Sequence, residues 1–542
     1  MRNKMKEIGK RVAVFLTKVP PMLCLPFSAV LMALCLMIPQ LGPIQWFCMI
    51  PALWYLLGRF QKERIPLRRA YGLGFLYYIV FFLIIWHWFI DLYPMEFAGI
   101  SKLEAVGLIA ICWIGLSLLQ ASLAALSFPV FAALLRTRPL QRVSILTPFL
   151  FASVYTVAEW AQTLTWSGVP WARLALGQSQ CGVLFHSVSL FGSYFLTFAI
   201  VAVNALAAYA ILHLDRARRV ALLCAAVFGL NLAAGMIGYF TAPVGQGEGV
   251  VVAAVQGNVG SANKWTADNT KQSYAVYEKY TAEAVARGAE IVVFPETFMP
   301  YRITENTDLG QYVSALAVTH GVTIRCGGFY YADDNVYNGI FTVYPNGEIS
   351  DTVYAKRRLV PFGEFVPWRP VIEFLIPPLA DMNILSDDLA PGTDSVVVET
   401  SAGLAGTLIC FDSIYENLTL DAVQNGAEYI CLSTNDSWFL DSIGVYMHHR
   451  QACLRAVESG RYIVRSADTG ISSMIAPDGR SYEVLPPLVE GVSVGTIYPT
   501  THRTLYSYIG NTMVYLLIAA ELLLAADGVI ILVKARKRKN EA

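Results

Sequence analysis

The sequence predicts a bundle of membrane-spanning helices joined to an α/β domain. Apolar residues make up 55% of the 542 residues and charged residues only 15%, with a mean hydropathy of +0.49, which is unusual for a soluble protein of this size. The apolar residues gather in runs long enough to cross a bilayer, and one long polar stretch interrupts them. The formal net charge is zero, so the composition gives no electrostatic reason to expect a nucleic-acid partner.

Eight apolar runs are predicted transmembrane helices, because about 20 apolar residues cover the hydrocarbon core of a bilayer. They lie at residues 20–38, 43–58, 70–90, 104–135, 146–164, 184–213, 219–240 and 512–533. The sequence therefore predicts three parts. A membrane bundle with the first seven spans covers residues 1–244, a polar domain covers 245–508, and an eighth span with a basic tail covers 509–542.

Basic residues predict the orientation of these spans, because Lys and Arg concentrate in cytoplasmic loops. Every second loop is basic, and so are the N-terminal segment and the tail from Lys534 to Lys539. The loops between them carry little charge. We therefore expect both termini in the cytoplasm and the polar domain on the outer face of an inner-type membrane.

The polar domain shows apolar, β-branched runs that alternate with helical patterns, which predicts an α/β domain with both sheet faces covered. Two helices are expected at residues 274–287 and 448–459, each ended by a glycine. Tight turns are expected at 345–347 and 477–479. The predicted strands are 249–255, 290–294, 322–329, 340–344, 404–409, 429–432 and 462–465.

Three stretches of the polar domain carry groups suited to acyl chemistry. Phe294-Pro295-Glu296 supplies a carboxylate, Lys356 an ammonium, and Ile409-Cys410-Phe411-Asp412 a thiol. A thiol is a weak nucleophile until a base takes its proton. A neighbouring lysine can stabilise the negative oxygen that forms when the sulfur attacks a carbonyl. Together, the carboxylate, the ammonium and the thiol predict a reaction in which a thioester forms and is then broken.

Each of these residues, taken alone, has a simpler explanation. Cys410 closes a predicted strand before a helix expected from Asp412 or Ser413, whose N-terminus would stabilise a thiolate, yet a lone cysteine there is more often structural. Glu296 alone is more often solvated, and Lys356 alone is more often a surface lysine. Their order along the chain carries the prediction, with Glu364 expected to keep Lys356 charged and aimed.

That order resembles the nitrilase superfamily, which places a Glu, a Lys and a Cys at strand ends of an α-β-β-α sandwich. With its apolar spans, the chain resembles the membrane branch of that superfamily, the apolipoprotein N-acyltransferases. The most specific stretches are Lys356 to Glu364 (KRRLVPFGE) and Asn435 to Phe439 (NDSWF). Further matching stretches are Gly168–Trp171, Gly177-Gln178, Val255–Asn258, Lys264-Trp265, Arg455-Ala456, Arg465-Ser466 and Thr469–Ile471.

The resemblance implies roles for single residues. Cys410 would be the nucleophile, Glu296 the general base and Lys356 the stabiliser of the oxyanion, with Glu364 supporting them. Trp265 and Trp438 would form aromatic walls near the substrate. The family has Cys-Tyr-Glu where this chain has Cys410-Phe411-Asp412, so we expect the contact of the shorter carboxylate to be re-aimed and the tyrosine hydroxyl to be missing.

The same resemblance implies an activity and a location. A fatty acyl chain would pass from a membrane phospholipid to a Cys410 thioester, and then to the α-amino group of the diacylglyceryl-cysteine that begins a bacterial lipoprotein. The protein would work as a monomer in the bacterial inner membrane. It would use no metal or organic cofactor, and His448-His449 on a predicted helix have no third ligand at metal-binding spacing.

Two other functions are consistent with parts of the sequence. A membrane-tethered amidase would use the same triad to hydrolyse a C–N bond, although a small polar substrate needs no apolar bundle. A transporter or scaffold with a degenerate outer domain would not need Glu296, Lys356 and Cys410 together. The four cysteines of the polar domain lack the spacing of a disulfide scaffold. Glu521 and Asp527 inside the last span are expected to pair with other spans, and His87 and Glu159 are expected to face the interior of the bundle.

Overall fold

The structure is a computed structural model that describes residues 20–95, 101–260, 267–375 and 388–541. The chain forms two compact units. The first unit comprises Met1–His87, Trp113–Phe240 and Ile509–Ala542, and the second comprises Trp88–Cys112 and Thr241–Tyr508. A segment between two apolar helices therefore belongs to the same unit as the polar domain.

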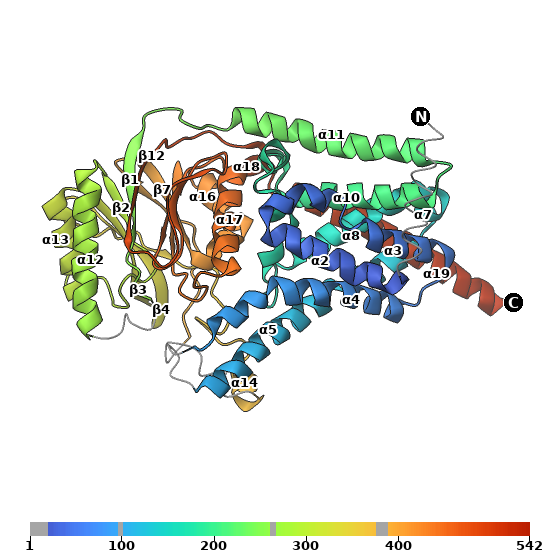
Figure 1. Ribbon diagram of the computed structural model, residues 1–542, viewed down its shortest axis with the longest axis horizontal. Helices are drawn as coiled ribbons and strands as arrows, with labels where there is room; N and C mark the ends of the chain where they lie inside the picture. Colours follow the sequence, from blue (N-terminus) through green and yellow to red (C-terminus); the bar gives the residue numbers. More distant parts are fainter. Residues whose placement is uncertain (1–19, 96–100, 261–266, 376–387, 542) are drawn as a thin grey trace. The chain divides into compact units, whose positions relative to one another are not determined.

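The first unit consists of helices (Figure 1). Within it, α10 packs against α3 and α8, and α2 packs against α4. α5 begins in the second unit and continues into the first. The helices are α2 (Cys24–Met37), α3 (Ile50–Lys62), α4 (Leu67–Ile85), α5 (Lys102–Ala124), α6 (Ser127–Leu134), α7 (Arg138–Arg142), α8 (Thr147–Ala161), α9 (Val188–Phe191), α10 (Ser193–Leu212), α11 (Ala217–Thr241) and α19 (Thr512–Glu541).

Six helical segments in the described part of the chain are long and apolar enough to cross a membrane. They are Pro39–Lys62, Leu67–Leu92, Lys102–Leu134, Ser193–Leu212, Ala217–Thr241 and Thr512–Arg538. The other two predicted spans correspond to α2, with 14 residues, and α8, with 15. At about 1.5 Å per residue these two helices are shorter than the hydrocarbon core, so the prediction of about eight spans holds only approximately.

The acidic residues of the bundle have polar partners, as the sequence predicts. Glu159 is buried, and its carboxylate accepts hydrogen bonds from the Leu174 N–H at 3.0 Å and the Thr197 hydroxyl at 2.7 Å. On α19, Glu521 accepts from Ser153, and Asp527 pairs with Arg138. These contacts offset the cost of placing a carboxylate among apolar helices.

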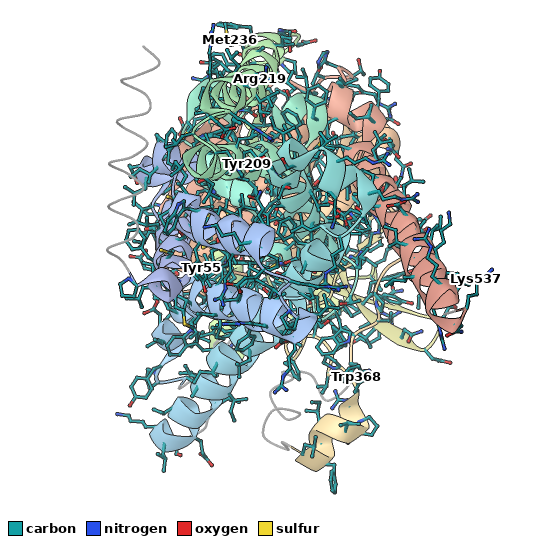
Figure 2. All side chains as sticks on the ribbon, turned by 90° about the vertical axis from the view of Figure 1, so that its right-hand side faces the viewer. Tyr55, Tyr209, Arg219, Met236, Trp368 and Lys537 are labelled. Atoms are coloured by element: carbon teal, nitrogen blue, oxygen red, sulfur yellow. The ribbon has the colours of Figure 1, made fainter. Side chains whose placement is uncertain are left out.

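The C-terminal end of α19 carries the basic tail. Its side chains project outward around Lys537 (Figure 2), and Lys534, Arg536 and Arg538 are likewise exposed. The arrangement fits a solvated anchor of the kind that the sequence predicts.

Two six-stranded sheets form the second unit, with strand orders β12-β1-β2-β3-β4-β5 and β11-β10-β9-β8-β7-β6. In each sheet the central strands run parallel and the outer ones antiparallel. The strands are β1 (Val250–Gln256), β2 (Ile291–Val293), β3 (Thr323–Ala332), β4 (Asn335–Val343), β5 (Tyr354–Ala355), β6 (Val397–Thr400), β7 (Gly403–Ile409), β8 (Tyr429–Thr434), β9 (Ile463–Ala467), β10 (Ser472–Ile475), β11 (Ser481–Leu485) and β12 (Gly491–Ile497).

Helices cover the outer face of each sheet (Figure 1). α12 (Ala267–Ala286) and α13 (Asp308–His320) pack on the first sheet, and α16 (Glu416–Gln424) and α17 (Ile443–Ser459) pack on the second. Two shorter helices, α14 (Arg369–Leu375) and α18 (Leu505–Ile509), lie in connections. The predicted α-β-β-α sandwich is confirmed.

The side chains of β1 point alternately to the two faces of its sheet, and this alternation shows how the sandwich is held together. Val252 and Ala254 face the second sheet and pack with Cys431 and Val464. Ala253 belongs instead to the core between the first sheet and its helices. Successive strand residues point to opposite faces, so a strand buried on both faces needs a continuous apolar run, and this is why β1 has no polar positions before Gln256.

The predicted strands are all present, and so is the turn at 477–479, which joins β10 to β11. Several edge strands were not predicted, among them β6 and β12. The prediction of a helix from Asp412 or Ser413 is wrong: Cys410–Ile414 forms a 3-10 turn, and α16 begins only at Glu416, because Tyr415 is extended.

We expect Arg455→Ala to destabilise the second unit strongly. Arg455 is fully buried, with Nη2 3.0 Å from Glu458 and Nη1 3.8 Å from Glu416, both also buried. Removing one partner of a buried ion pair costs about 3–5 kcal/mol. Thermal unfolding in detergent should show a midpoint lower by roughly 10 °C.

The control is Arg287→Ala, which removes an exposed cation 3.4 Å from Glu483 and 3.9 Å from Glu283, both on the surface. Exposed pairs contribute about 0–1 kcal/mol, so its midpoint should stay near that of the parent protein. Equal midpoints for the two variants would show that burial does not govern the Arg455 contribution.

Candidate active site

Cys410 begins the turn that follows β7. Its φ is +46°, in the left-handed region that a residue with a Cβ enters at a cost of about 1–2 kcal/mol. Side chains hold the turn in place: the Ser413 hydroxyl donates to the Cys410 carbonyl oxygen at 2.7 Å, and the Ile409 N–H donates to the Asp412 carboxylate at 3.1 Å. The residue is 9% exposed, so the thiol lies in a nearly closed site.

Glu296 lies just after β2, with its carboxylate buried among donors. One oxygen accepts from the Asn338 amide and the Lys356 ammonium, each at 2.7 Å, and the other accepts from the Asn435 N–H at 2.8 Å. Gly327 on the neighbouring strand makes room for this turn, because a Cβ there would come within 2.4 Å of the Thr297 nitrogen.

Lys356 follows β5 and is 2% exposed. Its Nζ lies 2.7 Å from Glu296 and 2.9 Å from Glu364. Burial alone lowers the pKa of this ammonium, but the Glu296 and Glu364 carboxylates more than offset it, so the pKa is raised well above its ordinary value. The structure thus keeps a charged donor available for a developing oxyanion.

Glu364 and Asn338 brace the lysine. Glu364 accepts the Val360 N–H at 2.9 Å, and the Asn338 amide nitrogen donates to both Glu364, at 2.9 Å, and Glu296. The predicted contact of Glu364 with Lys356 is present. Sequence reasoning missed Asn338, although an amide inside the apolar strand β4 is the kind of signal that could have identified it.

The thiol of Cys410 keeps its proton at rest. Burial raises its pKa, the Glu296 charge raises it further, and the Lys356 charge lowers it only in part. The expectation that a helix N-terminus stabilises a thiolate is therefore wrong here, because a short 3-10 turn follows Cys410 and desolvation dominates.

Asp412 ties the nucleophile turn to the segment around Lys356. Its carboxylate accepts from the Tyr354 hydroxyl at 2.9 Å, from the Arg358 N–H at 2.8 Å and from the Ile409 N–H. Burial raises its pKa to about 6, more than these donors and the Lys356 charge lower it. The Asp412 carboxylate thus contacts other residues of its own domain. Like Asn338, Tyr354 is a residue that the sequence did not suggest.

The three aromatic residues named from the sequence differ in what the structure describes. Phe411 is half-buried and meets Tyr415 edge to face, with ring centroids 5.5 Å apart. Trp438 is half-buried in the segment after β8. Trp265 lies outside the described residues, as does Lys264.

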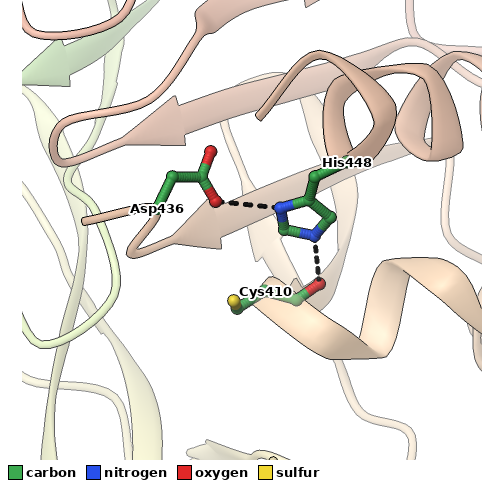
Figure 3. Close-up of side chains that lie close together, drawn as sticks. All are labelled: Cys410, Asp436 and His448. Carbon is green, nitrogen blue, oxygen red and sulfur yellow. Dashed lines mark hydrogen bonds and ion pairs between the residues drawn. The ribbon is translucent and has the colours of Figure 1, made fainter. Parts of the chain in front are cut away.

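A second polar cluster lies beside Cys410 and includes Asp436 and His448 (Figure 3). Ligand-type atoms of Cys410, Asp436 and His448 lie within 4.8 Å of one another. However, the His448 nitrogens face Asp436 and the Cys410 carbonyl oxygen, and the Arg465 guanidinium lies 2.8 Å from Asp436. A neighbouring guanidinium repels a dication, so these groups form a hydrogen-bond network better than a metal site.

The raised pKa of Asp412 predicts a stability change with pH. The folded protein holds this proton more tightly than the unfolded chain, so the stabilisation is complete below about pH 4 and is lost as the pH rises through about 6. Relative to Asp412→Asn, the parent protein should lose about 3 kcal/mol over that range. Thermal unfolding of both proteins from pH 4 to 8 measures this. A constant difference in midpoint would show that Asp412 does not titrate there.

Sequence comparisons match both parts of the chain. Residues 28–206 match the apolipoprotein N-acyltransferase N-terminal domain, and residues 251–506 match carbon-nitrogen hydrolase. The apolipoprotein N-acyltransferase of Gloeobacter violaceus is 30% identical over 491 residues, which cover 89% of each chain. That of Azotobacter vinelandii is 32% identical over 410 residues, covering 72% of this chain and 76% of the other.

Solved structures similar to this chain include an amidase from Nesterenkonia sp., 16% identical, with a TM-score of 0.37 over 48% of this chain and 94% of the amidase. Another is Saccharomyces cerevisiae Nit3, a member of the nitrilase superfamily, 18% identical, with a TM-score of 0.37 over 48% of this chain and 93% of that one. With the matches to both domains and to relatives along most of its length, the chain belongs to the apolipoprotein N-acyltransferase family.

Proposed function

We propose that this protein is an apolipoprotein N-acyltransferase in which Cys410 carries the fatty acyl chain as a thioester. The observation that carries the proposal is the buried cluster in which Glu296 contacts Lys356 and both act electrostatically on the Cys410 thiol. A carboxylate, an ammonium and a protonated thiol are the parts that two-step acyl transfer needs.

In the first step, Glu296 takes the proton of the Cys410 thiol, and the sulfur attacks the ester carbonyl carbon of a membrane phospholipid. A C–S bond forms, and the carbonyl electrons move to the oxygen. When the tetrahedral intermediate collapses, the ester C–O bond breaks, and the lysophospholipid leaves with the proton that Glu296 returns. The acyl chain remains on Cys410.

Lys356 stabilises the negative oxygen of that intermediate. The ammonium is held charged by two carboxylates, so it is ready before the oxyanion forms, and no reorganisation is needed when the charge appears. A backbone N–H at the Cys410–Phe411 turn is the second donor in this proposal.

In the second step, the α-amino group of a lipoprotein's N-terminal diacylglyceryl-cysteine attacks the thioester. Glu296 takes a proton from the amine, an amide bond forms, and the Cys410 sulfur leaves as a thiolate that recovers the proton. Every group that this mechanism uses belongs to one chain, so the proposal needs only a monomer.

The location of the domain follows from the loop charges. The proposal places residues 245–508 on the outer face of the bacterial inner membrane and both termini in the cytoplasm, on the basis of alternately basic loops. Phospholipid donors and lipoprotein acceptors both lie in that membrane, which gives the apolar helices a purpose.

A membrane-tethered amidase with the same triad is the alternative, with water in place of the lipoprotein amine. Six helical segments able to cross a membrane favour lipid substrates over a small polar amide. The two functions differ in what accumulates on Cys410.

We expect the purified protein, incubated with phospholipid and no acceptor, to gain one acyl chain on Cys410. Cys410→Ala should show no adduct, and Glu296→Gln should form it at least about 100-fold more slowly, since general bases typically contribute that much. Intact-protein and peptide mass spectrometry measure the adduct.

Cys431→Ala is the matched control, because Cys431 is a buried cysteine on β8 whose side chain packs between the sheets. It should acylate like the parent protein. Ammonia release from simple amides, without acyl adduct from phospholipid, would favour the amidase.

The orientation predicts where fused reporters work. A green fluorescent protein at residue 542 should be fluorescent, since it folds in the cytoplasm, and alkaline phosphatase there should be inactive. Alkaline phosphatase inserted at residue 245, before the domain, should be active. The reverse pattern at either position would contradict the assigned orientation.

A further inference from the structure

The main chain at Cys410 needs support from its surroundings. A left-handed φ of +46° at a residue with a side chain persists only where neighbouring contacts impose it. The same backbone geometry decides where Sγ points and where the following N–H groups point. Whatever holds the Cys410 carbonyl oxygen therefore sets the aim of the nucleophile.

Two side chains contact that carbonyl oxygen. The Ser413 hydroxyl donates to it at 2.7 Å, and His448 Nε2 lies 3.2 Å away, from α17. Nε2 is also 3.1 Å from Ser413 Oγ, whose hydrogen goes to the same carbonyl. Both neighbours are acceptors toward Nε2, so Nε2 donates. In Figure 3 the sulfur and the carbonyl oxygen lie at opposite ends of Cys410, and the sulfur lies within 4.8 Å of a ring nitrogen of His448.

Asp436 fixes the other side of the imidazole ring. Its Oδ1 lies 2.8 Å from His448 Nδ1 and accepts from Thr434 at 2.9 Å, while Oδ2 accepts from Arg465 at 2.8 Å. Burial alone raises the pKa of this carboxyl, but Arg465 and His448 more than offset it and hold it well below its ordinary value. Asp436 is thus an anion, and its Oδ1 and the Arg465 Nη2, 3.3 Å away, both contact Nδ1 and fix the orientation of the ring.

We propose that His448, oriented by Asp436, is a positioning residue that holds the Cys410 carbonyl oxygen and so aims the sulfur at the substrate ester. His448 is 1% exposed and contacts main chain rather than substrate. The inference rests on the proposed function, because it assigns His448 to the same acylation step. It also gives the His448-His449 pair of the sequence a role for its first member.

Substitution of His448 by Gln or by Asn distinguishes the contact made by Nε2 from the contact made by Nδ1. The amide nitrogen of Gln can occupy the position of Nε2, whereas that of Asn reaches only the position of Nδ1. We expect His448→Gln to keep the single-turnover rate constant for Cys410 acylation within about tenfold of the parent. We expect His448→Asn to lower it by roughly 100-fold, as a displacement of about 1 Å does. The phospholipid concentration at half-saturation should not change.

Only folded molecules become acylated in the single-turnover experiment. Partial unfolding of a variant therefore lowers the final amount of acylated protein but leaves the acylation rate constant unchanged. Ser413→Ala removes the other donor to the same carbonyl and should also slow acylation, by about tenfold. Equal rate constants for the Gln and Asn variants would overturn the proposal. If neither His448 variant folds, an unchanged rate in Ser413→Ala would overturn it instead.

His449→Gln is the matched control on the neighbouring position of α17. Its ring contacts Ser473 and Ser481 and not Cys410, so acylation should proceed as in the parent. If the parent protein forms no acyl adduct, the proposed function fails, and alkylation of Cys410 by iodoacetamide still tests the positioning. The Gln variant should then react like the parent and the Asn variant more slowly, while equal rates would overturn the inference.

Discussion

The site depends on one buried cation held between two carboxylates. An ammonium that is 2% exposed is unfavourable by itself, since removal from water costs several kcal/mol. Glu296 and Glu364 repay that cost only because their remaining oxygens are also satisfied, by Asn338, Asn435 and the Val360 N–H. The lysine, its two partners and the amide that bridges them therefore form one unit. Loss of any member leaves a buried charge without compensation.

The triad is drawn from both sheets of the sandwich. Glu296 and Lys356 follow β2 and β5 of the first sheet, whereas Cys410 follows β7 of the second. The separation of the Cys410 sulfur from the Glu296 carboxylate therefore depends on the packing between the sheets, in which Val252, Ala254 and Val464 take part. Asp412 adds a direct connection, because it joins the nucleophile turn to Tyr354 and Arg358 near the lysine.

The sequence predicted the sandwich and its central strands, because buried parallel strands are continuous apolar runs, and it placed Glu296 and Cys410 at the ends of two of them. It also named Lys356, which follows an edge strand and lies 2.7 Å from Glu296. It failed where tertiary contacts decide. The short edge strand β6 has a weak pattern. The helix expected after Cys410 gave way to a turn that buried side chains hold, and Asn338, Tyr354 and Asp436 have partners far away in the chain. The thiolate expectation failed because desolvation, which a sequence does not display, outweighs local charge.

The enclosure of Cys410 has a consequence for its reactivity toward oxidants. Oxidation by peroxide follows thiolate character and exposure, and this sulfur is both protonated and nearly enclosed. The other cysteines of residues 241–508, namely Cys326, Cys431 and Cys453, are buried and form no disulfide. A thiol held in this way resists oxidants while it stays enclosed, because burial disfavours the thiolate that they attack.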